Sequence, residues 1–228
     1  YFHDPEAALR YRFGEVCGRN LRALNISIGG DNYCYDLLLK DLKLANQMFN
    51  SQGAKTVLLG CSIEPELLAE PDIIDDMRRY SSIIARESIT WQALQDAGLK
   101  DNTYLVPDPA FLLETIKKPL PENFTEGGMV GLNVSPLVVE NEAVPGITME
   151  NYRALIRHIL DTTQMNVALI PHVVWKNNDD RTVLKRLYED FKETGRIVLI
   201  EDCGCEELKG YIARCRFFIG ARTHAKIG

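Results

Sequence analysis

Arg222 and His224 are the most specific pair of chemically active residue types in this sequence. They come directly after an apolar run at 217–219, and in an extended chain side chains two residues apart point in the same direction. A guanidinium would then hold an anion while an imidazole, a group that titrates near neutral pH, moves a proton on the same ligand. The alternative is a surface turn that contains both residues without using them.

Arg86 and Asp31 are further candidates. Arg86 follows a short apolar run, and its planar cation suits a carboxylate or a phosphate; a structural pair with Glu87 or another nearby acid is the alternative. The backbone amides of Gly29 and Gly30 could hold an anion, but Asp31 beside them would repel one. Asp31 therefore suits a sugar hydroxyl or a catalytic proton, unless the segment is only a tight turn with a helix cap.

Asn133 and His172 end two apolar runs in the second half of the chain. His172 follows a proline and could reach a ligand, although a satisfied core or rim histidine fits the sequence equally well. Cys203 and Cys205 have no second Cys or His pair at the spacing of a zinc site, so we expect no metal.

Strands alternate with helices along the whole chain. The expected strands are 23–28, 56–59, 82–85, 104–106, 130–134, 167–170, 197–200 and 217–219, and the expected helices are 35–52, 71–80, 89–97, 149–160, 181–192 and 206–213. This alternation predicts α/β architecture with mostly parallel sheets covered on both faces. Every candidate above lies at the carboxyl end of an expected strand, where such sheets bind ligands.

A stretch rich in proline and glycine at 117–128 predicts a boundary between two domains, 1–120 and 121–228. In a two-domain arrangement of this kind the ligand lies in the cleft between the domains. The chain begins at Tyr1 without an initiator Met and stops at Gly228 just after an expected strand. We therefore expect the first domain to be incomplete at its N-terminal end and the second at its C-terminal end.

Composition narrows the class of protein. Of the 228 residues, 46% are hydrophobic and 25% are charged, which is typical of a globular protein with a real core. The net charge of −6 opposes a general affinity for nucleic acid, so an anionic ligand needs a local cluster of cations. No apolar run reaches the length of a membrane helix or a signal core, and six scattered cysteines fit a reducing cytoplasm. Dinucleotide, Walker and nucleophile-elbow motifs are not found.

The residues at the strand ends together resemble the polysaccharide pyruvyl transferases. The matching segments run in order from about residue 23 to 225, and they are 27–32, 85–88, 106–111, 131–134, 170–172 and 219–225. The resemblance implies two Rossmann-like domains facing a cleft, similar to the GT-B glycosyltransferase fold. It also implies transfer of a pyruvyl group from phosphoenolpyruvate to a saccharide, with a pyruvate ketal as the product.

The resemblance carries over to individual residues. The family's acid after Gly-Gly falls on Asp31, its arginine in Ala-Arg-Glu on Arg86, and its Arg-x-His on Arg222 and His224. The chain departs from the family pattern at 226–228, where an apolar helix with a serine usually follows. We expect His224 to act as general acid/base and Asp31 to serve the acceptor hydroxyl, with the arginines on the anionic groups of the donor. The remaining residues expected in the substrate site are Gly29, Gly30, Asn133 and His172.

The implied partners are phosphoenolpyruvate and a nucleotide- or lipid-linked saccharide, with no cofactor, no metal and no nucleic acid. Surface polysaccharide (exopolysaccharide) assembly for the cell envelope would place the enzyme in the cytoplasm, and a lipid-linked acceptor would bring it to the inner face of the membrane. One alternative is a GT-B-type glycosyltransferase, in which Glu201 or Asp202 would hold the ribose of a nucleotide sugar. A non-catalytic saccharide-binding module is another, and it would separate Arg222 from His224.

Overall fold

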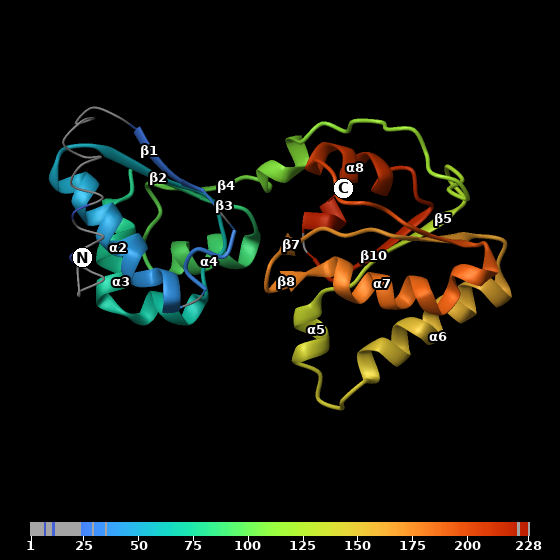
Figure 1. The fold of residues 1–228 in the computed structure, drawn as a ribbon. Coiled ribbons are helices and arrows are strands. Elements are labelled where there is room, and N and C mark those ends of the chain that lie inside the picture. Colours follow the sequence, from blue (N-terminus) through green and yellow to red (C-terminus); the bar gives the residue numbers. More distant parts are fainter. Residues whose placement is uncertain are drawn as a thin grey trace. The chain divides into compact units, whose positions relative to one another are not determined.

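The chain forms two compact α/β units, Tyr1–Pro109 and Ala110–Gly228, in the computed structural model (Figure 1). The structure describes residues 7, 11, 24–28, 30–34, 36–222 and 224–227. The division between the units lies at Pro109, whereas the sequence suggested residue 120. Each unit is described by itself below.

The first unit has a parallel four-stranded sheet in the order β1-β2-β3-β4. Its strands are β1 (Leu24–Ile28), β2 (Lys55–Cys61), β3 (Ser82–Ala85) and β4 (Thr103–Leu105). Its helices are α2 (Asp36–Ser51), α3 (Pro71–Arg79) and α4 (Ser88–Asp96), with a short 3-10 turn at Pro65–Ala69. Sequential strand order with helical crossovers aligns the carboxyl ends of all the strands at one edge.

The helices described in this unit cover one face of its sheet. Leu58 and Ile83 on that face pack with Met77 of α3 and Leu94 of α4 in a single buried cluster. Across the other face, Ile28, Leu59, Ile84 and Tyr104 stand side by side in register, and Ile28 and Tyr104 are 74% and 50% exposed. The expectation of a sheet covered on both faces is therefore not met within the described residues of the first unit.

The second unit has a parallel four-stranded sheet in the order β10-β5-β6-β9. Its strands are β5 (Met129–Asn133), β6 (Asn166–Leu169), β9 (Ile197–Leu199) and β10 (Phe217–Gly220), with a small antiparallel pair β7 (Val174–Trp175) and β8 (Asn178–Asp179). Its α-helices are α5 (Pro136–Glu140), α6 (Ile147–Thr162), α7 (Asp180–Phe191) and α8 (Cys205–Ile212). Three short 3-10 turns, Pro109–Leu112, Lys192–Thr194 and His224–Ile227, complete the pattern.

Both faces of this second sheet are covered. Figure 1 shows α6 and α7 on one side and α8 on the other. Ile156 and Leu184 belong to the buried cluster of the first side, and Leu208 and Phe124 to that of the second. The prediction of a doubly covered parallel sheet is correct for this unit.

The proline-rich stretch expected to be a linker packs against α8 instead. The amide of Ile116 donates to the carbonyl of Glu206 at 3.0 Å, and Nη1 of Arg214 donates to the carbonyl of Lys118 at 2.8 Å. Gly210 allows this close approach, because a Cβ there would lie 2.1 Å from the carbonyl oxygen of Ile116. These contacts make the stretch part of the second unit, which explains why the division lies at Pro109.

Candidate functional site

In the first unit, one residue from the carboxyl end of each strand contributes to a network around Arg86. Asp31 follows β1, Ser62 follows β2 and Asp108 follows β4, while Arg86 itself follows β3. Nε of Arg86 donates to Oγ of Ser62 at 2.8 Å, and Nη1 donates to Oδ2 of Asp108 at 3.1 Å. Nη2 donates to Oδ1 of Asp31 at 2.5 Å. The structure thus brings the predicted residues Arg86 and Asp31 into direct contact.

Gly30 lies under the Arg86 guanidinium. A Cβ at this position would be 2.0 Å from Nη1 of Arg86, so any other residue here would displace the guanidinium from its present place. Gly29, predicted to share the same turn, lies outside the described residues. Glu87 is not the partner of Arg86, since its carboxylate caps α4 by accepting from the amides of Ile89 and Thr90.

In the second unit, three predicted residues meet at the carboxylate of Asp180. Asn133 is the last residue of β5, His172 follows β6, and Arg222 follows β10. Oδ2 of Asp180 accepts from Nδ2 of Asn133 at 2.9 Å and from the amides of His172 and Val173 at 3.0 Å each. Asp180 is the first residue of α7, and its side chain is 0% exposed.

Arg222 is held by two acceptors. Its Nε and Nη2 atoms donate to Oδ1 of Asp180 at 3.2 and 2.8 Å, and Nη2 also donates to Oδ1 of Asn178 at 2.6 Å. Within the described part of the chain, Nη1 of Arg222 takes part in none of these contacts. A guanidinium held along one edge in this way presents its other edge in a fixed direction, which suits an anionic ligand.

His172 has an unusual environment for a histidine. Burial lowers its pKa, Asp180 opposes the shift, and the electrostatic effects of His224 and Arg222 lower the pKa further. The neutral imidazole is therefore favoured near pH 7. Among the described residues, Nδ1 of His172 and the buried Oδ1 of Asn133 have no hydrogen-bond partner. Both atoms are groups that a ligand or a water molecule can satisfy.

His172 and His224 line the same small cavity of the second unit, with a volume of about 210 Å³. Leu113 and Leu208 supply apolar surface, and Lys209 adds a cation whose Nζ donates to the carbonyl of Ala110 at 3.2 Å. Two imidazoles and one cation beside apolar walls suit a small organic anion that carries a carbon group.

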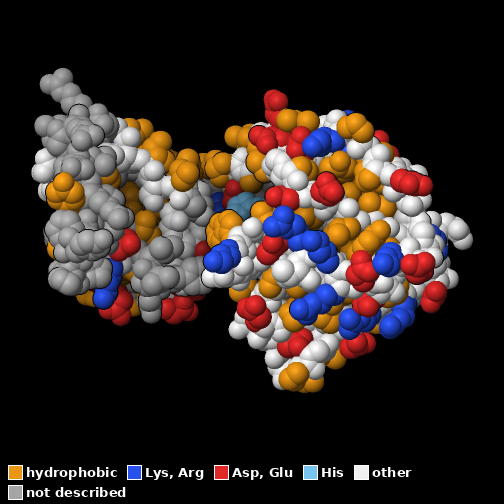
Figure 2. All heavy atoms as spheres, viewed as in Figure 1, with side chains coloured by type: hydrophobic (Ala, Val, Ile, Leu, Met, Phe, Trp, Pro, Cys, Tyr) orange, Lys and Arg blue, Asp and Glu red, His pale blue; other side chains and the backbone are white. Residues whose placement is uncertain are grey.

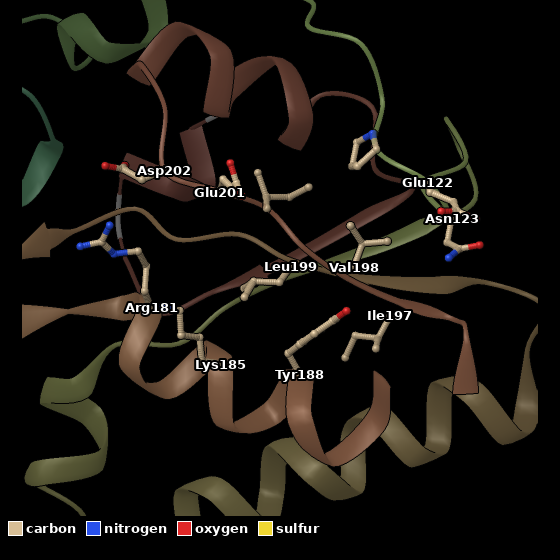
Figure 3. Close-up of a pocket in the computed structure, with 12 residues that line it drawn as sticks. Glu122, Asn123, Arg181, Lys185, Tyr188, Ile197, Val198, Leu199, Glu201 and Asp202 are labelled. Atoms are coloured by element: carbon tan, nitrogen blue, oxygen red, sulfur yellow. The ribbon is translucent and has the colours of Figure 1, made fainter. Parts of the chain in front are cut away.

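A larger cavity of about 800 Å³ lies along the edge strand β9. Figure 3 shows that Arg181 and Lys185 of α7 line this cavity. Glu201 and Asp202, from the segment after β9, line it as well. Nη2 of Arg181 is paired with Oδ2 of Asp179 at 2.7 Å. The cavity therefore has charges of both signs.

Sequence reasoning did not single out Asp180, Asn178 or Ser62, and it placed Asp108 at a strand end without giving it a role. Ser62 follows an apolar strand, so the rule that selected Arg86 could have found it. Asn178 and Asp180 lie in a polar stretch before a helix, where the sequence gives no sign that a carboxylate becomes wholly buried.

The surface carries no large field of one sign on the face drawn in Figure 2, where Lys and Arg alternate with Asp and Glu over the second unit. Across the described residues, no cluster of three or more His, Cys, Asp or Glu side chains could hold a metal ion. Within the same part of the chain, no helix has the length and apolar character needed to cross a membrane.

Two solved structures show the fold class. UDP-GlcNAc 2-epimerase from Methanocaldococcus jannaschii is similar over 97% of this chain, with 11% identity and a TM-score of 0.62. The Glycosylation Associate Protein (Gap123) complex from Streptococcus agalactiae is similar over 99%, with 10% identity and a TM-score of 0.54. This chain spans 62% and 44% of the lengths of those chains. Both have the GT-B fold, which confirms the predicted fold class.

The sequence profile of one family, described as polysaccharide pyruvyl transferase, matches residues 10–227. The chain therefore belongs to the polysaccharide pyruvyl transferase family, as its strand-end motifs predicted. Among curated proteins, none is significantly similar to it in sequence.

Proposed function

We propose that the protein transfers the pyruvyl group of phosphoenolpyruvate to two hydroxyls of a saccharide, forming a pyruvate ketal and releasing inorganic phosphate. The observation that carries this proposal is the second-unit site, where Arg222 is held by a buried carboxylate and two histidines line a small cavity. Membership of the polysaccharide pyruvyl transferase family supports the same reaction.

The donor is a small molecule with a carboxylate, a phosphate and an enol methylene. Arg222 would bind one of the anionic groups through its Nη1 edge, because its Nε and Nη2 atoms are engaged by Asp180 and Asn178. Lys209 would bind the other, and the apolar wall of the cavity would contact the methylene carbon. A local cationic site of this kind lets an acidic protein bind a multiply charged anion.

The reaction needs one proton at carbon and two attacks by oxygen. A proton added to the C3 methylene turns it into a methyl group and leaves a cation-like centre at C2, which the first sugar hydroxyl attacks. The second hydroxyl then displaces phosphate from C2. The two hydroxyls together release two protons. One replaces the proton added at C3, and the other leaves with the phosphate. We assign the proton transfer at C3 to His224, with His172 as a neutral neighbour.

Asp31 is assigned to the acceptor. Its carboxylate is oriented by Arg86 and remains 48% exposed, so an incoming hydroxyl can still reach it. In this role Asp31 orients or deprotonates the hydroxyl, while Gly30 and Arg86 fix its position.

The proposed acceptor is a nucleotide- or lipid-linked sugar used in surface polysaccharide assembly. Such acceptors are made on the cytoplasmic side of the membrane, and a lipid-linked one would bring the protein to that membrane surface. The scheme uses no cofactor and no metal, because the side chains named above supply the charge and the proton transfer.

The test is release of phosphate from phosphoenolpyruvate in the presence of a panel of nucleotide- and lipid-linked sugars, followed by ³¹P NMR. We expect release that depends on one acceptor and falls at least about a hundredfold in His224→Gln. His158→Gln, on the surface of α6, is the matched control and should keep its activity. Failure of every acceptor, together with no binding of phosphoenolpyruvate, would contradict the proposal; near-normal turnover in His224→Gln would overturn the assignment of His224.

A second function is favoured by one observation, the position of Glu201 and Asp202 at the larger cavity (Figure 3). An acid there could hold the ribose of a nucleotide sugar, as a GT-B glycosyltransferase requires. Binding of a UDP-sugar without any response to phosphoenolpyruvate would favour glycosyl transfer. If both bind and phosphate is released, the UDP-sugar is the acceptor of the pyruvyl group.

A further inference from the structure

Asp180 connects the carboxyl ends of three neighbouring strands of the second sheet. Its carboxylate accepts from Asn133 at the end of β5, from the His172 amide after β6, and from Arg222 after β10. These strands are adjacent in the order β10-β5-β6. No other acid in the described part of the chain forms an ion pair with Arg222.

The two oxygens of the buried Asp180 carboxylate have different partners. Oδ2 accepts the backbone amides of His172 and Val173 and the side chain of Asn133, so it fixes the turn that carries His172. Oδ1 accepts Nε and Nη2 of Arg222, so it fixes the plane of the guanidinium. A carboxylate at 0% exposure cannot leave these partners for water without a large cost in free energy.

We propose that Asp180 is a positioning residue of the transfer site, which holds the Arg222 guanidinium and, two residues further on, the His224 imidazole in the geometry that the anionic donor needs. This inference deepens the proposed function and rests on it. Asp180 itself does not touch the donor in this proposal.

The electrostatics of the cavity agree with this role. Asp180 is the charge that opposes the lowering of the His172 pKa, while Arg222 and His224 are among the charges that cause it. The four groups therefore share one electrostatic environment. Replacing Asp180 would change both the direction of the guanidinium and the field at the two imidazoles.

The first unit offers a matched control. Asp76 is also 0% exposed and also accepts from an arginine, with Oδ1 3.3 Å from Nη1 of Arg79. Its partners Tyr33, at 2.6 Å, and Asn46, at 3.0 Å, belong to the first unit, and none of the contacts given for Asp76 involves Arg222, His172 or His224. Asp76→Asn thus removes a buried carboxylate of the first unit without removing any contact of Arg222.

The experiment measures binding of phosphoenolpyruvate by calorimetry in Asp180→Asn, Asp76→Asn, Arg222→Ala and the double variant Asp180→Asn/Arg222→Ala. We expect Asp180→Asn to raise the Kd about tenfold or more, and Asp76→Asn to leave it unchanged. Asp180→Asn should cause no further loss of affinity in the Arg222→Ala background, because its effect on donor binding acts through Arg222. An unchanged Kd in folded Asp180→Asn, or an additive loss in the double variant, overturns the proposal.

Asn178→Ala provides a second route if Asp180→Asn does not fold. It removes the 2.6 Å contact with Arg222 and leaves no buried charge behind. A raised Kd in this variant supports positioning of the guanidinium by its acceptors, and an unchanged Kd overturns the proposal.

Failure of the proposed function has a different signature. The chain contains only four histidines, so their ring signals can be assigned by NMR from single His→Gln variants. If wild type does not bind phosphoenolpyruvate, the donor assignment fails, and the ring signals then decide the role of Asp180. Displaced signals of His172 and His224 in Asp180→Asn, but not in Asp76→Asn, support positioning, and unmoved signals overturn it.

Discussion

Arg86 in the first unit and Arg222 in the second have different surroundings. Each follows a parallel strand, but Arg86 is paired with two carboxylates and Arg222 with one. The partners of Arg86 are Asp31 and Asp108, at 48% and 12% exposure, whereas Asp180, which pairs with Arg222, is wholly buried. Asp31 can therefore exchange its contact with Arg86 for water, whereas the buried Asp180 stays in contact with Arg222.

This difference suggests a division of tasks. A fixed guanidinium is suited to holding a donor in one orientation, because little is lost in ordering it when the ligand binds. A guanidinium paired with a half-exposed acid is suited to a site where that acid must interact with an incoming hydroxyl. The sequence alone assigned both arginines the same role on the donor.

The largest expected effect is on stability when Arg222 is removed. Arg222→Ala leaves Asp180 as an unpaired buried charge, which should lower the free energy of unfolding of the second unit by about 3–5 kcal/mol. Arg86→Ala should cost the first unit about 1–3 kcal/mol, since Asp31 can be hydrated. Hydrogen exchange measured by mass spectrometry follows the two units separately. If the two substitutions lower the free energy of unfolding of their units equally, Asp180 and the partners of Arg86 do not differ in the way proposed here.

A second expected effect concerns the glycine below Arg86. Gly30→Ala should displace the guanidinium and cost about 1–3 kcal/mol, because the added Cβ would lie 2.0 Å from Nη1 of Arg86. Gly204→Ala is the matched control, since the nearest side-chain atom to a Cβ there is 3.5 Å away. Urea unfolding measures both. If Gly30→Ala is as stable as Gly204→Ala, Arg86 has room to move and its site is not fixed by packing.

Asp31→Asn should change stability little, by less than about 1 kcal/mol, because the pair it breaks is half exposed. Its effect should appear in catalysis. Turnover should fall strongly, whereas affinity for phosphoenolpyruvate should stay the same or increase once a negative charge is removed. Steady-state kinetics and calorimetry separate the two quantities. A loss of donor affinity with normal turnover would move Asp31 to the donor side.

The smallest expected effect is a dependence of stability on pH that comes from His172. Its folded pKa lies below the unfolded value of 6.5, because of burial and the charges of Arg222 and His224, with Asp180 opposing them. The unfolded chain therefore binds more protons below about pH 6.5. The contribution of His172 to the free energy of unfolding is complete above about pH 6.5, and it is lost as the pH falls towards the folded pKa.

Urea unfolding between pH 7.5 and 5 can isolate this contribution. Wild type should lose stability on acidification more steeply than His172→Gln, whose carboxylates are the same. Parallel curves for the two proteins would show that His172 has an ordinary pKa.

The positions of most site residues could be predicted, but their partners could not. Parallel strands meet at one edge, so polar residues after apolar runs, such as Asp31, Arg86 and Arg222, were expected to gather there. That Asp180 pairs with Arg222 depends on how α7 packs against the sheet, which no local pattern encodes. The Arg86–Gly30 contact likewise depends on the spacing between two strands.

The coverage of the first sheet was predicted less well than that of the second. Helical periodicity shows that a helix exists, but it does not say which face of a sheet the helix covers. Ile26, Ile28 and Tyr104 fit a buried strand by type, and yet they are exposed among the described residues. Such apolar positions looked like core because residue type alone does not distinguish a covered face from an open one.

The role of Arg222 in donor binding is tested by calorimetric titration of phosphoenolpyruvate into wild type and into Arg222→Lys, which keeps the positive charge and so leaves Asp180 paired. We expect saturable binding to wild type and at least about tenfold weaker binding to the variant, since an ammonium cannot hold Asp180 and the donor at once in the geometry of a guanidinium. Equal binding to both proteins, or no binding to wild type, would contradict this role.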